Sequence, residues 1–487
     1  MSKASTFGQL KEQGYEPRSV KTEIRDNLLH RLKNDEPIFP GIVGYDKTVI
    51  PQVQNALLSR HDFILLGLRG QAKTRLLRAL PTLLDDEIPV VEGCPVNDDP
   101  WNPVCDSCKR RVESEGNDLP IAWMARESRY QEKLATPDVT IADLIGDIDP
   151  IKAATRKLAF TDPEVIHYGI IPRTNRGIFA INEVPDLQAR IQVGLLNILE
   201  EGDIQIRGFP IRMPMDILLV FSANPEDYTN RGNIITPLRD RISSQILTHY
   251  PRTVAESRQI TGQESWTERG SDVEVAIPDY LRDIVEHVAF EARSSEFVDQ
   301  NSGVSARMTI SLMENVHSNA ERRGVCTGAS STVARVSDVV AASSAITGKI
   351  ELVYEGEREG VKSVAARLVG QAVKSVFDES FPDAYKLEEA ESASDYTPIL
   401  NHFKKGETLD ISDETDDEEL YRQLSEIPGL EDVTRKFLEL DGTPETAAAM
   451  EFVLEALHQS SLLAKDEIVG GRAYRDMFED MVRNLRE

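Results

Sequence analysis

The sequence has few cysteines, no long apolar run and fewer basic than acidic residues. Four cysteines in 487 residues are too few for the disulfide framework of a small secreted protein. No uninterrupted apolar run approaches the roughly 18 residues of a membrane-spanning helix. Residues 1–10 also lack the hydrophobic core of a secretory signal. We therefore expect no membrane insertion and a cytoplasmic location.

Positive charge is also scarce: the sequence has 55 Lys and Arg residues and 82 Asp and Glu residues, for a net charge of -27. This balance disfavours a broad surface for nucleic acid or an anionic membrane, so we expect no nucleic-acid partner. Part of the excess lies in residues 407–419, which contain acidic residues and no basic one. Such a run is typical of a solvated linker and less often of a docking tail for a basic partner.

What is present is an ordinary globular composition, with 40% hydrophobic and 28% charged residues. Residues 41–250 alternate short apolar runs with helical periodicity, which predicts an α/β domain with a largely parallel sheet. Buried strands are expected at residues 62–67, 177–182 and 217–222. The sequence also predicts amphipathic helices at residues 74–84 and 187–202. A hairpin is expected at residues 203–215.

The rest of the chain divides by composition and periodicity. Residues 85–130 are rich in Pro, Asp and Asn and are expected to form an insertion in the α/β domain. A helix is expected near residues 20–32, and another begins at Thr443, where Pro444 suits the first helical position. The expected parts are an N-terminal helical segment (1–40), the α/β core (41–250), an all-α domain (251–380), an acidic linker (381–422) and an acidic, mainly helical extension (423–487).

The strongest chemical signal is residues 67–74 (GLRGQAKT), between an expected buried strand and an amphipathic helix, where a phosphate-binding loop must lie. Small residues let backbone N–H groups surround a phosphate, and the helix N-terminus adds a favourable dipole. A lysine offers charge to the β- and γ-phosphates, and a threonine hydroxyl ligates Mg²⁺. An accidental strand–turn–helix is the alternative. We predict that ATP and Mg²⁺ bind through Gly67, Arg69, Gly70, Gln71, Ala72, Lys73 and Thr74.

Ala72 stands where this loop usually has its second glycine. Alanine enters the positive-φ region only at a cost in free energy. We therefore expect Ala72 to keep an ordinary backbone conformation.

Residues 177–183 (GIFAINE) have the form of a Walker B segment, an apolar strand followed by an acid. Such a strand normally ends in Asp-Glu, whose first acid holds Mg²⁺ through water and whose second polarises the attacking water. Asn182 replaces the first acid, and its amide accepts from a metal-bound water without charge, so Mg²⁺ affinity should be reduced. Glu183 is retained as the predicted catalytic base, the alternative being a solvated residue at the end of a strand.

Two further polar positions follow the third strand. Asn224 is placed to orient the attacking water at the γ-phosphate. Arg241, in residues 237–242 (PLRDRI), is predicted to stabilise charge developing on the ATP of a neighbouring subunit. Arg239 is the second choice for this role, and a structural salt bridge is the alternative for Arg241. Arg307 opens an amphipathic helix and is the predicted second sensor, with a plain surface arginine as its alternative.

Cys94, Cys105 and Cys108 cluster in the insertion, the last two as a C-x-x-C pair. Zinc takes four ligands in structural sites, and the sequence offers three with an unidentified fourth. A Zn²⁺ site, reduced free thiols and a redox pair therefore remain three interpretations.

These motifs, in this order, resemble the ATPase subunit of magnesium chelatase and its MoxR-like AAA+ relatives. The resemblance covers residues 41–323 and is most specific at residues 145–150 (IGDIDP), 170–185 and 224–242. It implies a P-loop AAA+ core with a parallel sheet, a helical lid after it and hairpin insertions. Residues 203–215 match the hairpin before the sensor strand.

The resemblance also implies function: an ATPase working as a homo-oligomeric ring, a hexamer, that remodels or activates a partner protein, often one with a von Willebrand A-type domain. Ala72, Asn182, the cysteine-bearing insertion and the C-terminal extension depart from the family. A weakly hydrolysing, nucleotide-gated assembly scaffold and an ATPase subunit of a metal chelatase are the alternatives. A transcriptional activator is disfavoured because the C-terminal region shows no basic helix-turn-helix.

Overall fold

The computed structural model describes residues 3–157, 163–206, 212–225, 232–383, 395–468 and 470–477. The chain forms two compact units, Met1–His249 and Tyr250–Glu487. Within the described ranges, no helix is both long enough and apolar enough to cross a membrane.

The first unit is built on a five-stranded sheet in which every neighbouring pair is parallel. In chain order its strands are β1 (Phe63–Leu66), β4 (Tyr130–Leu134), β7 (Gly177–Asn182), β10 (Ile217–Ala223) and β11 (Ser244–Leu247). Their order across the sheet is β11-β1-β10-β7-β4. The predicted α/β class and three buried strands are confirmed. Because the strands are parallel, their carboxyl ends lie at one edge.

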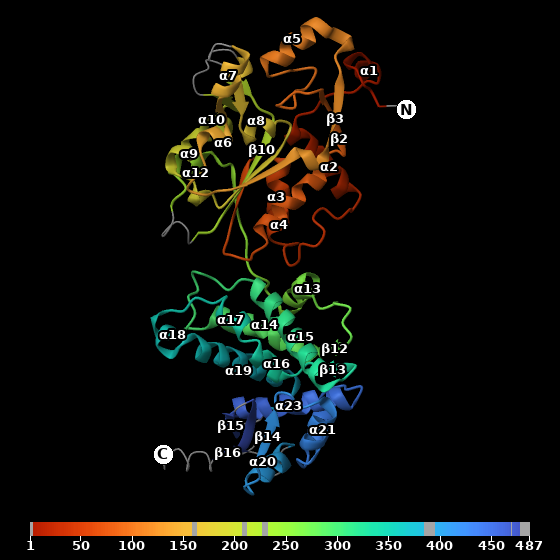
Figure 1. The fold of residues 1–487 in the computed structure, drawn as a ribbon, viewed down its shortest axis with the longest axis vertical. Helices are drawn as coiled ribbons and strands as arrows, with labels where there is room; N and C mark the ends of the chain where they lie inside the picture. The colour runs from red at the N-terminus through yellow and green to blue at the C-terminus, as the bar shows by residue number, and fades with distance from the viewer. Residues whose placement is uncertain are drawn as a thin grey trace. The chain divides into compact units, whose positions relative to one another are not determined.

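Helices cover both faces of this sheet (Figure 1). Side chains alternate along β1, so Phe63 and Leu65 enter one apolar cluster while Ile64 enters the other. The first cluster includes residues of α2 (Val20–Lys33), α3 (Val49–Leu58) and α4 (Lys73–Ala79). The second includes residues of α9 (Ala189–Gly194), α10 (Leu196–Glu200) and α12 (Thr236–Arg241). Burial on both faces accounts for the continuous apolar runs of the strands.

The predicted helices of this unit are shorter than expected. α4 passes into a 3-10 turn, η1 (Leu80–Leu83), yet the leucines of the predicted apolar face are all buried. The helix expected over residues 187–202 is divided into α9 and α10. The expected hairpin is confirmed, because β8 (Asp203–Gln205) pairs antiparallel with β9 (Arg212–Pro214). Its predicted turn at residues 208–210 lies outside the described residues.

The insertion packs against the N-terminal segment. Its strands β2 (Glu87–Val91) and β3 (Ile121–Ala125) pair antiparallel, with α5 (Asp106–Glu115) between them in sequence. Phe7 of α1 (Phe7–Glu12) meets Trp101 edge to face at 4.9 Å between ring centroids. The segment before the core is thereby part of the first unit.

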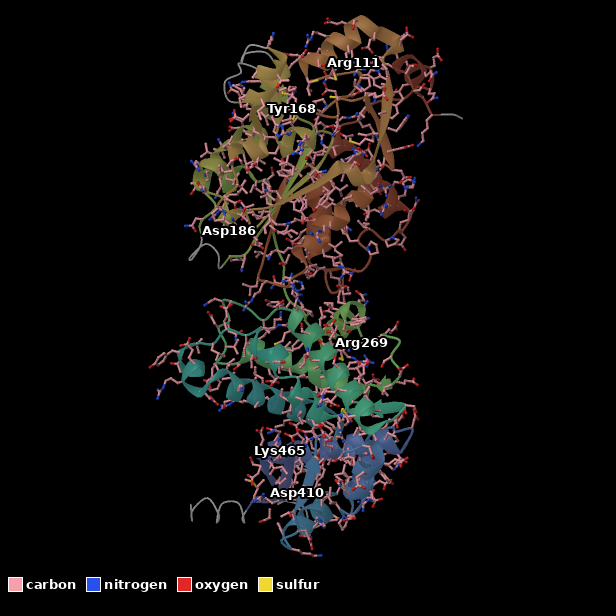
Figure 2. All side chains as sticks on the ribbon, viewed as in Figure 1. Arg111, Tyr168, Asp186, Arg269, Asp410 and Lys465 are labelled. Carbon is pink, nitrogen blue, oxygen red and sulfur yellow. The ribbon has the colours of Figure 1, made fainter. Side chains whose placement is uncertain are left out.

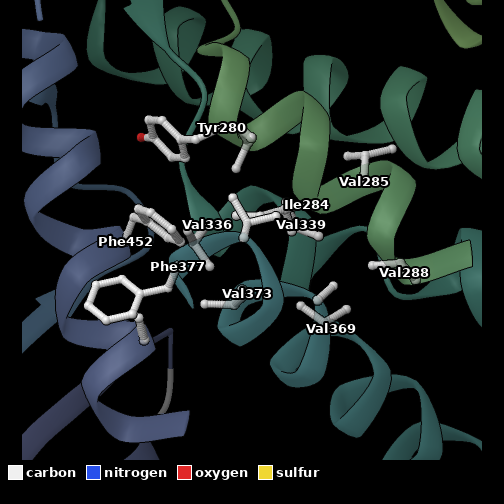
Figure 3. Packing of buried hydrophobic residues seen from close by; sticks show 14 of the residues in the cluster. Tyr280, Ile284, Val285, Val288, Val336, Val339, Val369, Val373, Phe377 and Phe452 are labelled. Atoms are coloured by element: carbon white, nitrogen blue, oxygen red, sulfur yellow. The ribbon is translucent and has the colours of Figure 1, made fainter. Parts of the chain in front are cut away.

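The second unit has one apolar core formed mainly by α14 (Asp279–Ser294), α15 (Arg307–Thr327), α19 (Val361–Ser380) and α23 (Thr443–Gln459). In Figure 3, Tyr280 of α14 faces Phe452 of α23; the two rings stack at 4.8 Å between centroids. The helix predicted from Thr443 is confirmed. This core joins residues expected to form a separate lid and C-terminal extension.

Strands in the second unit depart from the all-α expectation. β12 (Glu274–Ala276) pairs parallel with β13 (Ser331–Val333). β14 (Leu409–Ser412), β16 (Gly471–Asp476) and β15 (Leu463–Ile468) form a three-stranded antiparallel sheet. β15 and β16 are neighbours in the chain, but the pairs β12–β13 and β14–β16 join residues far apart, which local periodicity does not reveal.

The acid-rich residues 407–419 differ from an extended linker, because they include β14 and the start of α21 (Asp417–Ser425). Ile411 and Leu420 are fully buried, so apolar side chains anchor both elements despite the surrounding acids. Asp416 caps α21, and a carboxylate oxygen of Asp417 accepts from the backbone N–H of Val333 at 3.0 Å. Several of the acids thus have structural roles.

Candidate active site

The carboxyl edge of the sheet brings the predicted phosphate loop beside the third strand. Leu66 pairs with Ala223 on one side and with Leu247 on the other. Beyond this register, Gly67 N donates to Ala223 O at 3.2 Å, and Thr248 N donates to Leu66 O at 2.8 Å. The loop therefore begins between the ends of β10 and β11, next to the half-buried Asn224.

Side chains from outside the loop hold its shape. The Thr248 hydroxyl donates to Gln71 Oε1 at 2.7 Å, and the Tyr45 hydroxyl donates to Gln71 O at 2.8 Å. A Cβ on Gly67 would lie 1.9 Å from Thr248 Oγ1, so a larger residue would displace the Thr248 and Gln71 side chains. Sequence analysis missed Tyr45 and Thr248 because they are distant in the chain and match no motif.

Ala72 is left-handed, with φ 53° and ψ 15°, so the expectation of an ordinary backbone conformation is wrong. Ala72 is the residue immediately before α4, and Gly70, two residues earlier, is also left-handed at φ 74°. The loop reverses direction into α4 through both positions. For alanine this conformation costs about 1–2 kcal/mol, which the surrounding contacts must offset.

Lys73 is 7% exposed, in contrast to the solvated position expected of an empty phosphate site. Its Nζ donates to Leu68 O at 3.0 Å and to Gly67 O. A buried ammonium needs such acceptors, and the curled loop supplies them. Thr74 follows in the first turn of α4 and is half-buried. To contact a phosphate, Lys73 must exchange at least one of these carbonyls for it.

The Walker B position is occupied by a buried amide. Asn182 is 6% exposed, and its Oδ1 accepts from the Ser222 hydroxyl at 2.9 Å. Phe221 pairs with Ile181 in the sheet, so the next residues of the two strands, Ser222 and Asn182, lie side by side. Sequence analysis missed Ser222, although it lies inside the predicted third strand. One lone pair of the Asn182 oxygen is therefore already engaged.

Glu183 directly follows β7 and is itself left-handed, at φ 57° and ψ 50°. This conformation is uncommon for a residue with a long side chain and costs about 1–3 kcal/mol. It turns the chain at once into η5 (Val184–Asp186). Strain of this kind, beside a phosphate loop, is typical of positions retained for chemistry.

The predicted arginines lie in two different units. Arg241 ends α12 and donates from Nε to Glu200 Oε2 at 2.7 Å and from a guanidinium nitrogen to Pro237 O at 3.1 Å. With side-chain exposures of 29% and 54%, the Arg241–Glu200 pair is worth only about 0–1 kcal/mol and is easily exchanged. Arg239 is exposed in the same helix. Arg307 is the exposed first residue of α15, in the second unit.

The three clustered cysteines meet in the insertion, together with Asp98. One ligand atom from each of the four residues lies within 4.8 Å of every other. Burial raises the pKa of Asp98 to about 7, and the neighbouring Cys105 side chain adds to the shift. Hydrogen bonds from Cys105 and Cys108 lower the pKa of the Cys94 thiol. In Figure 2, Arg111 and Tyr168 mark the part of the unit that holds this cluster.

Comparison with known proteins identifies related sequences. The model of the sigma-54 interaction domain matches residues 154–246, which include β7, β10 and Arg241. The chain is 31% identical over 201 residues to the magnesium-chelatase subunit ChlI homolog of Methanocaldococcus jannaschii, covering 40% of this chain and 52% of that protein. It is 30% identical over 231 residues to magnesium-chelatase subunit ChlI of Nostoc sp., covering 47% and 58%. The chain thus spans little more than half the length of these relatives.

A solved complex between subunits BchI and BchD of magnesium chelatase is a further structural match, with a TM-score of 0.35 and 20% identity. The match covers 66% of this chain and 99% of that chain.

The parallel sheet, the phosphate loop after β1 and the acid after β7 define a P-loop protein of the AAA+ class. Within that class, the chain is similar to ChlI subunits of magnesium chelatase over 201 and 231 residues.

Proposed function

We propose that this protein hydrolyses ATP in the cytoplasm as a homo-oligomeric ring, a hexamer, and uses the energy to remodel a partner protein. The observation that carries the proposal is the strand order β11-β1-β10-β7-β4. It brings the phosphate loop, Glu183 and Asn224 to one edge of one sheet. The geometry at the end of β10 supports this, since Gly67 N donates directly to Ala223 O.

The loop residues fit a triphosphate. Gly67 and Gly70 keep the backbone free of side chains where it must approach a phosphate closely. Lys73 is already held over the loop by its carbonyls, so it needs only to shift its Nζ toward a bound anion. A Mg²⁺ ion bound by Thr74 and the nucleotide would neutralise phosphate charge. Asn182 would hold a water bound to this Mg²⁺ through the remaining lone pair of its side-chain oxygen.

Hydrolysis requires groups on either side of the γ-phosphate. Glu183 takes a proton from the attacking water, and Asn224 orients that water. Arg241 leaves Glu200 and contacts the ATP of the neighbouring subunit, where it stabilises charge in the transition state. Arg307 acts as a second sensor from a lid formed by residues 251–380. A partner with a von Willebrand A-type domain is the candidate that receives the resulting motion.

The proposal is tested by steady-state phosphate release from the purified chain, compared with its Lys73→Ala variant. We expect turnover by the wild-type chain. In the variant we expect ATP affinity to fall by about 100-fold or more, because the positive charge that Lys73 offers to the phosphates is removed. Lys33→Ala, which removes an exposed lysine at the end of α2, is the matched control and should bind normally. Wild-type ATP affinity in a folded Lys73→Ala variant would disprove the phosphate-loop assignment.

A nucleotide-gated scaffold that assembles but hardly turns over is the second candidate. The hydrogen bond between Ser222 and the uncharged Asn182 favours it, because the usual acid at the metal is absent. This candidate predicts ATP-dependent assembly, seen by light scattering, with negligible phosphate release at saturating Mg²⁺. Sustained turnover under those conditions would reject it.

Metal chelation, as in the named magnesium-chelatase relatives, is the remaining alternative. It would require that the assembled protein stimulate Mg²⁺ insertion into a porphyrin when candidate partner subunits are supplied. A porphyrin-insertion assay with ATP distinguishes it from remodelling alone.

A further inference from the structure

The cysteine cluster has the dimensions of a single metal site. A tetrahedral ion with metal–sulfur bonds of 2.3 Å holds its sulfur ligands about 3.8 Å apart. Cys94 Sγ and Cys105 Sγ are 4.0 Å apart, and the four candidate ligand atoms lie within 4.8 Å of one another. A disulfide between these two sulfurs would require about 2.05 Å. The spacing therefore fits a shared ion better than a bond between the two cysteines.

Asp98 supplies an independent sign of a missing ligand. It is fully buried, and its Oδ2 accepts from Cys105 N at 3.0 Å. Its Oδ1 is also buried and has no hydrogen-bond partner in the structure. A buried carboxylate oxygen without a partner is costly, and a bound cation removes that cost.

The surrounding backbone is arranged to support thiolates. Asp98 N donates to Cys94 Sγ at 3.4 Å, and Cys108 N donates to Cys105 Sγ at 3.3 Å. Cys105 lies immediately before α5, with Cys108 in its first turn. Such N–H contacts orient metal ligands and stabilise their negative charge. Cys105 and Cys108 are 3% and 2% exposed, so an ion here would be shielded from solvent.

We propose that Cys94, Asp98, Cys105 and Cys108 bind one structural Zn²⁺ ion, with Asp98 Oδ1 as the fourth ligand. Three sulfurs and one oxygen close a tetrahedral shell, which leaves no open position for catalysis. The proposal does not depend on nucleotide binding.

The zinc would fix the insertion to the sheet beside the Walker B strand. Within the segment that links Cys94 to Asp98, Val96 O accepts from Asn175 Nδ2 at 3.0 Å and Asn97 Nδ2 donates to Arg173 O at 2.7 Å. Asn175 Oδ1 in turn accepts from Asp216 N at 2.9 Å, immediately before β10. The metal would therefore hold a loop that contacts the segment entering β7, and Asn175 links that segment to the start of β10.

The test is metal analysis of the full chain, followed by cobalt substitution. We expect one zinc per chain, and the absorption spectrum of tetrahedral cobalt thiolate after exchange. Asp98→Asn preserves the size of the side chain but weakens the ligand, so zinc affinity in a chelator competition should fall roughly 100-fold. Asp98→Cys should restore tight binding by completing a four-sulfur shell. Cys326→Ser, which removes the exposed cysteine of α15, is the control and should change neither measurement.

The outcomes are distinguishable from failure of the ATPase proposal, because ATP binding by the same samples is measured separately. Metal-free native protein whose three cysteines react fully with a thiol reagent would overturn the site. So would a Cys105–Cys108 disulfide found by mass spectrometry, or one equivalent of iron in place of zinc. An Asp98→Asn variant with unchanged zinc affinity and cobalt spectrum would overturn the assignment of the fourth ligand.

Discussion

At the scale of single residues, the active-site edge contains two strained positions, Ala72 and Glu183, both left-handed. They differ in what the side chain contributes. Ala72 has only a methyl group, so its conformation carries a cost with no evident chemical return. Glu183 carries the predicted base, so the strain there falls on a residue to which chemistry is assigned.

Replacing Ala72 with glycine should stabilise the first unit. Glycine adopts φ 53° without the steric cost to alanine, although it gains freedom in the unfolded chain. We expect a net gain of about 0.5–1 kcal/mol in the free energy of unfolding. Urea unfolding of the nucleotide-free protein measures it.

Ala154→Gly is the matched control, because Ala154 is exposed within the helix α7 (Pro150–Arg156). There glycine should lower the free energy of unfolding by up to about 1 kcal/mol. If both substitutions destabilise the unit equally, Ala72 is not strained in solution.

Asn182→Asp should lower the Mg²⁺ concentration needed for half-maximal phosphate release. The new carboxylate adds a negative charge near the metal, and the Ser222 hydroxyl can donate to it as it does to the amide. We expect a decrease of several-fold, measured by Mg²⁺ titration at saturating ATP. An unchanged midpoint would mean that Asn182 only orders the end of the strand.

Glu183→Gln, at the residue after Asn182, should separate ATP hydrolysis from ATP binding. The amide cannot take the proton of the attacking water, so turnover should fall about 100-fold or more while ATP remains bound. Nucleotide retention after gel filtration, measured beside phosphate release, checks both parts. Full turnover by this variant would remove Glu183 from the proposed mechanism.

At the scale of secondary-structure elements, buried charge joins α23 to the C-terminal sheet. Glu455 of α23 accepts from Lys465 Nζ of β15 at 2.7 Å and from the Tyr474 hydroxyl of β16 at 2.9 Å. Burial is the largest single influence and opposes ionisation, but Lys465, Gln459 and His458 together outweigh it, and the pKa of Glu455 is lowered to about 2. The carboxylate therefore favours the folded state.

The pH dependence follows from the direction of this shift. Since the folded pKa lies below the ordinary value of 4.5, the stabilisation is complete above pH 4.5 and is lost as pH falls toward 2. We expect a loss of about 3 kcal/mol in the second unit from this group. Urea-dependent hydrogen exchange of α23, followed across this range, measures it. Glu455→Gln should flatten that dependence, whereas Glu467→Gln, at an exposed position of β15, should leave it unchanged.

At the scale of the whole molecule, the proposed ring requires that a residue of one subunit complete the site of the next. Arg241 is suited to this because its present partner, Glu200, is exposed and weakly bound. Arg241→Ala should lower turnover by about 100-fold or more without changing ATP affinity. Glu200→Gln removes only the partner within the chain and should retain most activity.

Mixing subunits provides the decisive measurement. Rings that combine Arg241→Ala and Lys73→Ala subunits contain some interfaces with both a binding loop and an arginine from the neighbour. Phosphate release by the mixture should therefore exceed that of either variant alone. Mixed rings as inactive as the separate variants would assign Arg241 a role within its own subunit.

The sequence by itself determined the α/β class, the buried strands and the positions of the phosphate loop, Glu183 and Asn224. These features are local, because apolar runs and short motifs are set by neighbouring residues. It also indicated a cluster of three thiols, since the spacing of Cys94, Cys105 and Cys108 is visible in the chain.

The tertiary structure alone decided the left-handed Ala72, the buried Lys73 and the contact between Asn182 and Ser222. Each depends on residues brought together by the sheet, such as Thr248 against Gln71. It also placed Asp98 among the cysteines and paired β14 with β16, whose nearest partners, Ser412 and Gly471, are 59 positions apart in the chain. Long-range packing supplies the energy for these arrangements, so no local pattern of residues predicts them.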